Sequence, residues 1–176
     1  MTESLEIRES LCGDIASIEA LYPDAFPDED LLPLVRDLLQ EAPIVLSLAG
    51  IIGSSLVAHV ILTTCGISGS RDDKVALLGP LAVAPNCQRQ GIGSAMVHVG
   101  LQQLENVGVT QVYVLGDPAY YGRFGFLPEV RVAPPYPLPA EWRGAWQSMS
   151  LGSARPPRQG ELSVPLPWLQ PALWAP

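Results

Sequence analysis

Hydrophobic and polar positions in the first forty residues predict one strand followed by two helices. Residues 5–8 alternate between apolar and polar side chains, as a half-buried strand does. Residues 13–21 carry apolar side chains at helical spacing. Residues 28–39 predict a second helix, with Asp28–Asp30 at its positive end and Pro33 in its first turn, where proline is tolerated.

A block of three strands follows. Residues 44–48 and 55–64 are expected to pair through a hairpin connection formed by residues 49–54. The third strand, residues 75–83, is apolar on both faces, which is typical of a central position in a sheet. Pro80 removes a backbone donor from that strand, so a bulge is expected there.

The middle of the chain continues the alternation of helices and strands. A helix is expected over residues 94–107, a strand over 109–115, a short helix over 119–124 and a further strand over 142–151. Strands interleaved with helices indicate an α/β fold.

The composition changes towards the C-terminus. Twelve of the eighteen prolines lie from Pro118 onward, and the last segment also carries Trp168 and Trp174. We expect one domain over residues 1–154, with residues 155–176 as a proline-rich arm in extended conformation that packs on the domain through its tryptophans.

Charge and hydropathy exclude several function classes. The net charge is −8 and Lys74 is the single lysine, which argues against a nucleic-acid partner because such binding needs a basic patch. No window holds ~18 uninterrupted apolar residues, so no transmembrane helix is expected. The acidic first residues have the wrong sign for a secretory signal, so we expect a cytoplasmic protein.

Metal ligands are not apparent in the sequence. The three cysteines, Cys12, Cys65 and Cys87, are far apart and form neither a disulfide framework nor a paired metal motif. His59 and His98 have no partner at metal-ligand spacing, and each lies in an apolar run. We therefore predict no metal and interpret both histidines as structural.

A glycine-bearing loop is the strongest chemical signal. It follows an apolar run and Pro85, contains Gly91 and Gly93, and leads directly into a helical pattern. Backbone N–H groups at such a helix start can bind an anion such as a phosphate. A tight turn without a ligand explains the glycines equally well. The loop has no lysine for a P-loop, and Met96 stands where a dinucleotide fingerprint needs its third glycine.

Three segments together resemble the GNAT superfamily of acyl-CoA-dependent N-acetyltransferases, and most closely its YhbS-like branch. Leu81-Ala82-Val83 followed by Pro85 is similar to the family's cofactor strand. Residues 88–93, Gln-Arg-Gln-Gly-Ile-Gly, fit its pyrophosphate loop. Residues 115–126, from Leu-Gly-Asp-Pro to Gly-Phe, resemble a segment of that branch, whereas the last 40 residues or so match only loosely.

This resemblance implies a mixed, centrally splayed β-sheet flanked by helices, with acetyl-CoA as co-substrate and an amine as acceptor. The pantetheine arm would pair with the central strand, and the loop amides would bind the pyrophosphate. Arg89 contacts a phosphate or is simply a solvated loop residue. The cofactor-binding residues implied in this way are Leu81, Ala82, Val83, Gln88, Arg89, Gln90, Gly91, Ile92, Gly93, Ser94, Tyr121 and Phe124.

The resemblance also implies two catalytic groups. The main-chain N–H of Val83 would stabilise the developing oxyanion. Tyr121, four residues before Gly125, occupies the position of the family's general acid and would protonate or hydrogen-bond the departing thiolate. A phenol (pKa ~10) is a weaker acid than a thiol (pKa ~8.5), so the hydrogen bond is the safer expectation. Tyr120 is the lesser candidate.

Other aspects of the chemistry stay open. Many relatives use a glutamate near the central strand as general base, but residues 75–83 contain no carboxylate, which leaves Asp117, Glu29 and His59 as candidates. A CoA-binding sensor or interaction module without turnover is the main alternative function, and hydrolysis or O-acyl transfer is a third. The acceptor's identity is open, and the protein is expected to be a monomer or a homodimer.

Overall fold

The two longest strands, β3 (Ser55–Ile67) and β4 (Ser70–Val83), each pass through two compact units of the fold. The first unit comprises Met1–Leu62 and Gly79–Gln103, and the second comprises Thr63–Leu78 and Leu104–Pro176. The computed structural model describes residues 3–152 and 158–175.

In the first unit, the strand order is β1 (Leu5–Glu9), β2 (Val45–Ile52), β3. Strands β1 and β2 are antiparallel, with Leu5 opposite Ile52 and Glu9 opposite Leu48. The expected first strand is therefore confirmed.

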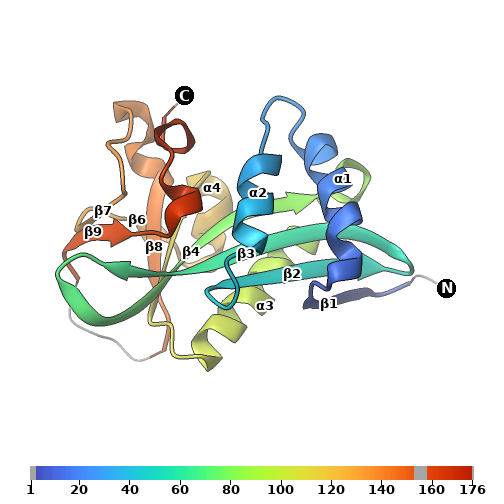
Figure 1. Cartoon of the computed structure of the whole chain (residues 1–176), viewed down its shortest axis with the longest axis horizontal. Coiled ribbons are helices and arrows are strands. Elements are labelled where there is room, and N and C mark those ends of the chain that lie inside the picture. Colours follow the sequence, from blue (N-terminus) through green and yellow to red (C-terminus); the bar gives the residue numbers. More distant parts are fainter. Residues whose placement is uncertain (1–2, 153–157, 176) are drawn as a thin grey trace. The chain divides into compact units, whose positions relative to one another are not determined.

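Helices cover both faces of these strands. Neighbouring strand residues point to opposite faces, and Ala58 and His59 of β3 show this clearly. His59 accepts or donates a 2.7 Å hydrogen bond with Tyr22 of α1 (Ile15–Ala25). The other face carries Ala58 and Gly50, and Met96 of α3 (Ile92–Asn106) packs there. A Cβ added to Gly50 would lie 3.0 Å from the Met96 sulfur and 3.1 Å from the Ala58 Cβ. Figure 1 shows α1 and α3 on these opposite sides.

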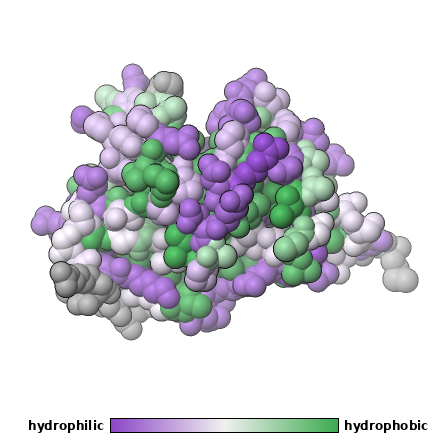
Figure 2. All heavy atoms as spheres, in the orientation of Figure 1, coloured by the Kyte–Doolittle hydropathy of each residue, from purple (hydrophilic) through white to green (hydrophobic). Residues whose placement is uncertain are grey.

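Helix α2 (Leu32–Leu39) begins later than the sequence predicts. Asp28–Asp30 precede the helix, and the expected start at residue 28 is wrong. The late start keeps Pro33 in the first turn, since a proline further inside would lose a backbone hydrogen bond. Leu34, Val35 and Leu38 are buried, and Figure 2 shows hydrophilic side chains (purple) on the outward face of α2.

The hairpins are tighter than expected. Strand β2 continues to Ile52, because its last residues pair with β1, so the predicted connection over residues 49–54 shrinks to Gly53 and Ser54. Gly53 has φ +62°, a conformation that favours glycine. Similarly, β3 runs to Ile67 and β4 starts at Ser70, five residues before the predicted start.

The second unit contains a mixed sheet in the order β3, β4, β5 (Gln111–Leu115), β8 (Trp146–Ser150), β6 (Leu127–Pro128). Strand β4 pairs in parallel with β5, with Val75 opposite Gln111 and Leu77 opposite Tyr113. Strands β5 and β8 are antiparallel. Because β4 continues six residues beyond Leu77, to Val83, its pairing with β5 covers only part of its length.

Strand β4 departs from regular geometry next to Pro80. Gly79, the residue before it, has φ +132°, a backbone angle that residues other than glycine rarely adopt. This irregularity adjoins the position where the sequence predicts a bulge.

Three segments of the second unit differ in their bounds from the sequence prediction. Strand β5 begins at Gln111, two residues after the expected start. The short helix after β5 consists of α4 (Pro118–Tyr121) and a 3₁₀ turn, Gly122–Phe124. The strand expected over residues 142–151 is β8 alone, because Ala140–Ala145 forms a 3₁₀ helix that includes Trp142.

The C-terminal segment is more structured than the extended arm that the sequence predicts. Strand β9 (Gly160–Ser163) pairs with β3 and with β7 (Val132–Ala133), and two 3₁₀ turns follow, Leu166–Trp168 and Pro171–Leu173. Hydrogen bonds from the indole N–H groups of the two tryptophans stabilise these turns. Trp168 donates to the Thr63 hydroxyl at 3.2 Å, and Trp174 donates to the Trp168 carbonyl at 3.0 Å.

Candidate functional site

The expected cofactor strand and loop are contiguous in the first unit. Leu81, Ala82 and Val83 are the last residues of β4, and the chain then turns through a 3₁₀ helix, Pro85–Cys87. Gln88, Arg89, Gln90 and Gly91 form the loop, while Ile92, Gly93 and Ser94 form the first turn of α3. The strand, loop and helix start therefore follow one another as the sequence predicts.

Side chains of the loop stabilise its shape. The Gln88 amide donates to the Val83 carbonyl at 3.0 Å, and the Gln90 amide donates to the Asn86 carbonyl at 3.3 Å. Arg89 is the single positive-φ residue other than glycine in the described part of the chain, with φ +61°, and Gly91 has φ +81°. These left-handed residues let successive backbone N–H groups turn towards one side, an arrangement that binds anions.

The backbone amides of Arg89, Gln90 and Gly91 donate to no group within residues 3–152 and 158–175. A Cβ on Gly91 would meet nothing within 4 Å, so the space in front of the backbone is open. The start of α3 adds the positive end of a helix dipole. The loop thus fits the pyrophosphate of a CoA ester, which would be held by main-chain amides.

Tyr121 and Phe124 belong to the second unit. Asp117 caps α4 by accepting a 2.9 Å hydrogen bond from the Ala119 amide, which fixes the start of the helix. The Tyr121 ring packs against Phe126 at 5.7 Å and Phe124 at 6.3 Å between ring centroids. A Cβ on Gly116 would overlap the Tyr121 ring, so the ring's position requires glycine there.

The surroundings of Tyr121 define its acid–base character. Burial of the ring and the neighbouring Tyr120 raise the pKa of the Tyr121 phenol above its usual value. The hydroxyl is therefore protonated at neutral pH. It can donate a hydrogen bond, but the raised pKa makes complete proton transfer less favourable.

The three candidate bases have different environments. His59 is fully buried, and both of its ring nitrogens are hydrogen-bonded, to Tyr22 and to Ser47. Burial lowers the pKa of its ring to about 4. This is the environment of a structural histidine. Asp117 is exposed and serves as the cap of α4, and Glu29 is exposed before α2.

The described part of the chain offers neither a reactive cysteine at Cys65 nor a metal-binding cluster. Burial raises the pKa of the Cys65 thiol to about 12, so a thiolate nucleophile is disfavoured there. Within the described ranges, no cluster of three or more His, Cys, Asp or Glu side chains could hold a metal ion.

None of the described helices has the length and apolarity needed to span a bilayer.

Sequence reasoning missed two features that shape these segments. One is the left-handed backbone of Arg89, for which an arginine gives no signal. The other is the contact between Gly116 and the Tyr121 ring, although a glycine directly after a strand and before Asp-Pro was a visible hint.

Comparison with known proteins identifies the class. The sequence profile of the acetyltransferase (GNAT) family matches residues 15–126, which include the strand, the loop and Tyr121. The chain belongs to this family.

Individual relatives agree with this assignment. The uncharacterized N-acetyltransferase YjhQ of Escherichia coli is 33% identical over 145 residues, 79% of this chain and 80% of that protein. YhbS of the same species is 30% identical over 139 residues, 78% of this chain and 80% of YhbS. These matches confirm the resemblance to the YhbS-like branch.

Solved structures show the same fold. The structure of YhbS in complex with CoA has a TM-score of 0.82 at 24% identity and covers 97% of this chain and 94% of that one. A GNAT acetyltransferase from Brucella melitensis in complex with acetyl-CoA has a TM-score of 0.75 at 25% identity, with 94% and 99% covered. The expected mixed sheet with flanking helices is thereby confirmed.

Proposed function

We propose that the protein transfers an acetyl group from acetyl-CoA to an amine by direct attack on the thioester. The observation that carries the proposal is the open loop of Arg89–Gly91, whose amides have no partner in the described chain and precede the start of α3. We assign residues 1–154 to the acetyltransferase domain and 155–176 to its C-terminal arm. The cytoplasmic location and the choice between monomer and homodimer stay predictions.

Acetyl-CoA would supply the activated acetyl group as a thioester. Leu81, Ala82 and Val83 would bind its pantetheine arm along the end of β4, and the amides from Gln88 to Gly93 would bind the pyrophosphate. The Val83 N–H would donate to the developing oxyanion, an interaction worth about 3 kcal/mol when donor and oxygen are well aligned. Phe124 would contact the cofactor beside Tyr121.

Tyr121 would donate a hydrogen bond to the leaving sulfur. Its raised pKa supports this role over complete protonation of the thiolate, because a phenol that is a weaker acid than the CoA thiol keeps its proton. The base that deprotonates the amine is not assigned. The environment of His59 disfavours direct contact with an acceptor, since both nitrogens are bonded inside the core.

A calorimetric titration with acetyl-CoA tests the cofactor site. We expect micromolar binding, about −8 kcal/mol. Gly91→Glu should abolish it by placing a carboxylate in front of the loop amides. Gly91→Ala is the matched control, because it carries the same φ strain without the charge, and it should retain most of the affinity. Equal binding by Gly91→Glu and Gly91→Ala would contradict the proposed loop contact.

Release of CoA with a panel of amines tests the transfer itself. We expect amine-dependent release, and Tyr121→Phe should lower kcat by about ten-fold or more. Tight cofactor binding with no release for any amine would favour the sensor function instead. Release without amine would indicate hydrolysis.

A further inference from the structure

Gln147 is a buried polar side chain to which the proposed transfer assigns no role. It is the second residue of β8 and is 1% exposed. Val114 of β5 is paired directly opposite, so the two side chains point to the same face of the sheet. Burying an amide costs free energy unless hydrogen bonds replace those to water. The amide nitrogen of Gln147 donates to the carbonyls of Gly116 at 3.1 Å and Ala145 at 3.4 Å.

These hydrogen bonds fix the backbone where the chain leaves β5. Leu115 is the last residue of this strand and pairs with Trp146. The amide of the next residue, Gly116, donates to the Ala145 carbonyl at 2.9 Å. The Gly116 carbonyl accepts from the Gln147 side chain. Gly116 is therefore held through both of its backbone polar groups.

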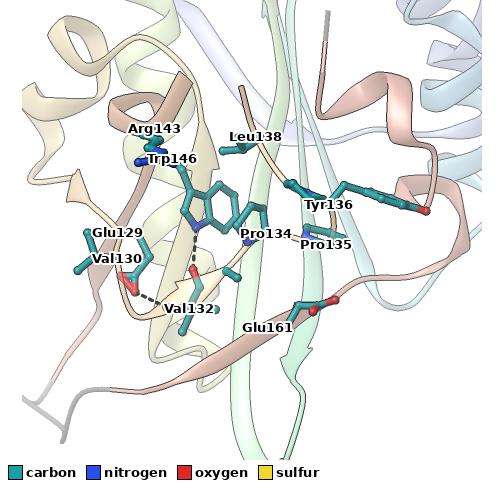
Figure 3. A pocket seen from close by; sticks show the side chains of 12 residues that line it. Glu129, Val130, Val132, Pro134, Pro135, Tyr136, Leu138, Arg143, Trp146 and Glu161 are labelled. Atoms are coloured by element: carbon teal, nitrogen blue, oxygen red, sulfur yellow. Dashed lines mark hydrogen bonds between the residues drawn. The ribbon is translucent and has the colours of Figure 1, made fainter. Parts of the chain in front are cut away.

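Strand β8 gives Gln147 a rigid support. The neighbouring residue, Trp146, points to the opposite face of the sheet. Its indole stacks on Tyr113 with 5.6 Å between ring centroids and donates to the Val132 carbonyl at 2.8 Å. Figure 3 shows this hydrogen bond beside a cavity of about 530 Å³ whose lining includes Trp146. Packing on one face and hydrogen bonds on the other thus hold the Gln147 amide in place.

The backbone at Gly116 in turn positions Tyr121. The Asp117 carbonyl, one residue further on, accepts from the Tyr121 amide at 2.9 Å. The Tyr121 ring occupies the space where a Cβ on Gly116 would lie. Tyr121 therefore depends on this junction twice, through the first turn of α4 and through the packing of its ring. A shift of the Gly116 backbone would move the phenol.

We propose that Gln147 is a positioning residue, whose amide fixes the Gly116 carbonyl and thereby holds the Tyr121 hydroxyl where the sulfur of CoA leaves. This role rests on the proposed function for the chemistry of Tyr121, whereas the placement of the ring is measured without substrate. A buried donor that acts through a second residue sets the geometry of the reacting group. Its effect on the rate should therefore require the Tyr121 hydroxyl.

Fluorine NMR of the chain labelled with 3-fluorotyrosine tests the placement. The chain has five tyrosines, and the Tyr121 signal is the one that Tyr121→Phe removes. Gln147→Met keeps the length of the side chain, removes its donor and should change the chemical shift of the Tyr121 signal. Gln111→Met is the matched control in β5, because its amide donates to Ser148 at 3.0 Å instead, and it should leave that signal unchanged. Thermal melting curves show that each variant is folded.

A double-mutant cycle tests the effect on catalysis. With Tyr121 present, Gln147→Met should lower kcat about ten-fold, because a small displacement of a reacting group is costly. The KM for acetyl-CoA should change less than about two-fold. In the Tyr121→Phe background, Gln147→Met should lower kcat less than about two-fold, since no hydroxyl is left to misplace. Equal losses in the two backgrounds would indicate a general structural effect and overturn the positioning role.

A second variant serves if Gln147→Met does not fold. Gln147→Glu keeps the shape of the side chain and places a carboxylate, which cannot donate when ionised, against the Gly116 carbonyl. It should change the Tyr121 signal and lower kcat in the same way. A Tyr121 signal that stays unchanged in a folded Gln147→Met or Gln147→Glu variant, or that Gln111→Met changes equally, would overturn the proposal.

Failure of the proposed function gives a different result. Absence of CoA release from the unmutated protein with every amine would contradict the transfer, and a normal kcat in Tyr121→Phe would contradict the role of its hydroxyl. In either case the Tyr121 signal of the Gln147 variants still decides whether Gln147 places the ring.

Discussion

His59 is part of a buried hydrogen-bond chain in the first unit. Its ring forms hydrogen bonds with the Tyr22 hydroxyl at 2.7 Å and with the Ser47 hydroxyl at 2.7 Å. The Ser47 hydroxyl is also hydrogen-bonded to the Ser10 hydroxyl at 2.6 Å. The ring is edge-on to Tyr22, with 5.6 Å between centroids. A buried imidazole with both nitrogens bonded contributes to stability in its neutral form, so protonation is costly.

The pH dependence of stability follows from this environment. The folded-state pKa of His59 is lowered to about 4 from 6.5, so between these values the unfolded state binds a proton that the folded state does not. The stabilising contribution of neutral His59 to the free energy of unfolding is complete above pH 6.5 and should fall as the pH drops towards 4. The contribution of this residue is about 1.4 kcal/mol per pH unit.

Urea unfolding at pH 7, 6 and 5 measures this slope. His59→Asn should remove that part of the slope, whereas His98→Asn, at an exposed histidine of α3, should retain it. Identical slopes for His59→Asn and the unmutated protein would contradict the buried neutral histidine.

At the scale of elements, the segment from β5 into α4 positions Tyr121. Gly116 follows the strand, Asp117 caps the helix, and the Tyr121 ring lies where a side chain on Gly116 would be. The position of the proposed acid thus depends on a residue that carries no functional group.

Gly116→Ala should therefore impair catalysis through Tyr121. The added methyl group must displace the ring, and a displacement near 1 Å can cost about 100-fold in rate. We expect kcat to fall by about ten- to a hundred-fold, with the affinity for acetyl-CoA at the Gly91 loop less affected. Gly122→Ala, where a Cβ meets nothing within 4 Å, is the control and should keep kcat. A normal kcat in Gly116→Ala would show that the ring position is not critical.

Local pattern predicted the elements better than their ends. The apolar runs placed β3, β4, β5 and α3 correctly, because periodicity and the glycine loop act within a short window. The late start of α2 and the early start of β4 depend on Pro33 and on pairing between distant strands, which a local pattern does not contain. The order of β4, glycine-bearing loop and α3 was predictable, whereas the left-handed backbone of Arg89 and the contact between Gly116 and the Tyr121 ring depend on the folded structure.

At the scale of the whole molecule, the C-terminal segment contributes to the core of the second unit. Trp174 is 1% exposed, packs on Trp146 at 5.8 Å and donates to the Trp168 carbonyl. The contact between Trp174 and Trp146 packs the C-terminal segment against β8.

Trp174→Ala should lower the free energy of unfolding by about 3–5 kcal/mol, because it leaves a large cavity. Leu166→Ala, in the same segment but at a side chain that is 77% exposed, should change it by less than about 0.5 kcal/mol. Chemical denaturation of the two variants measures the difference. Equal stabilities would mean that the C-terminal segment does not contribute to the folded core.

The path of the chain between the two units limits how the protein can be divided. It crosses three times, after Leu62, Leu78 and Gln103, and these crossings fall inside β3, β4 and α3. Neither unit is a continuous stretch of sequence, so no single cut releases one of them whole. Exchanging one unit with that of a relative would require three junctions, each within a regular element. A chimera with a single junction would therefore combine segments of both parents within at least one unit.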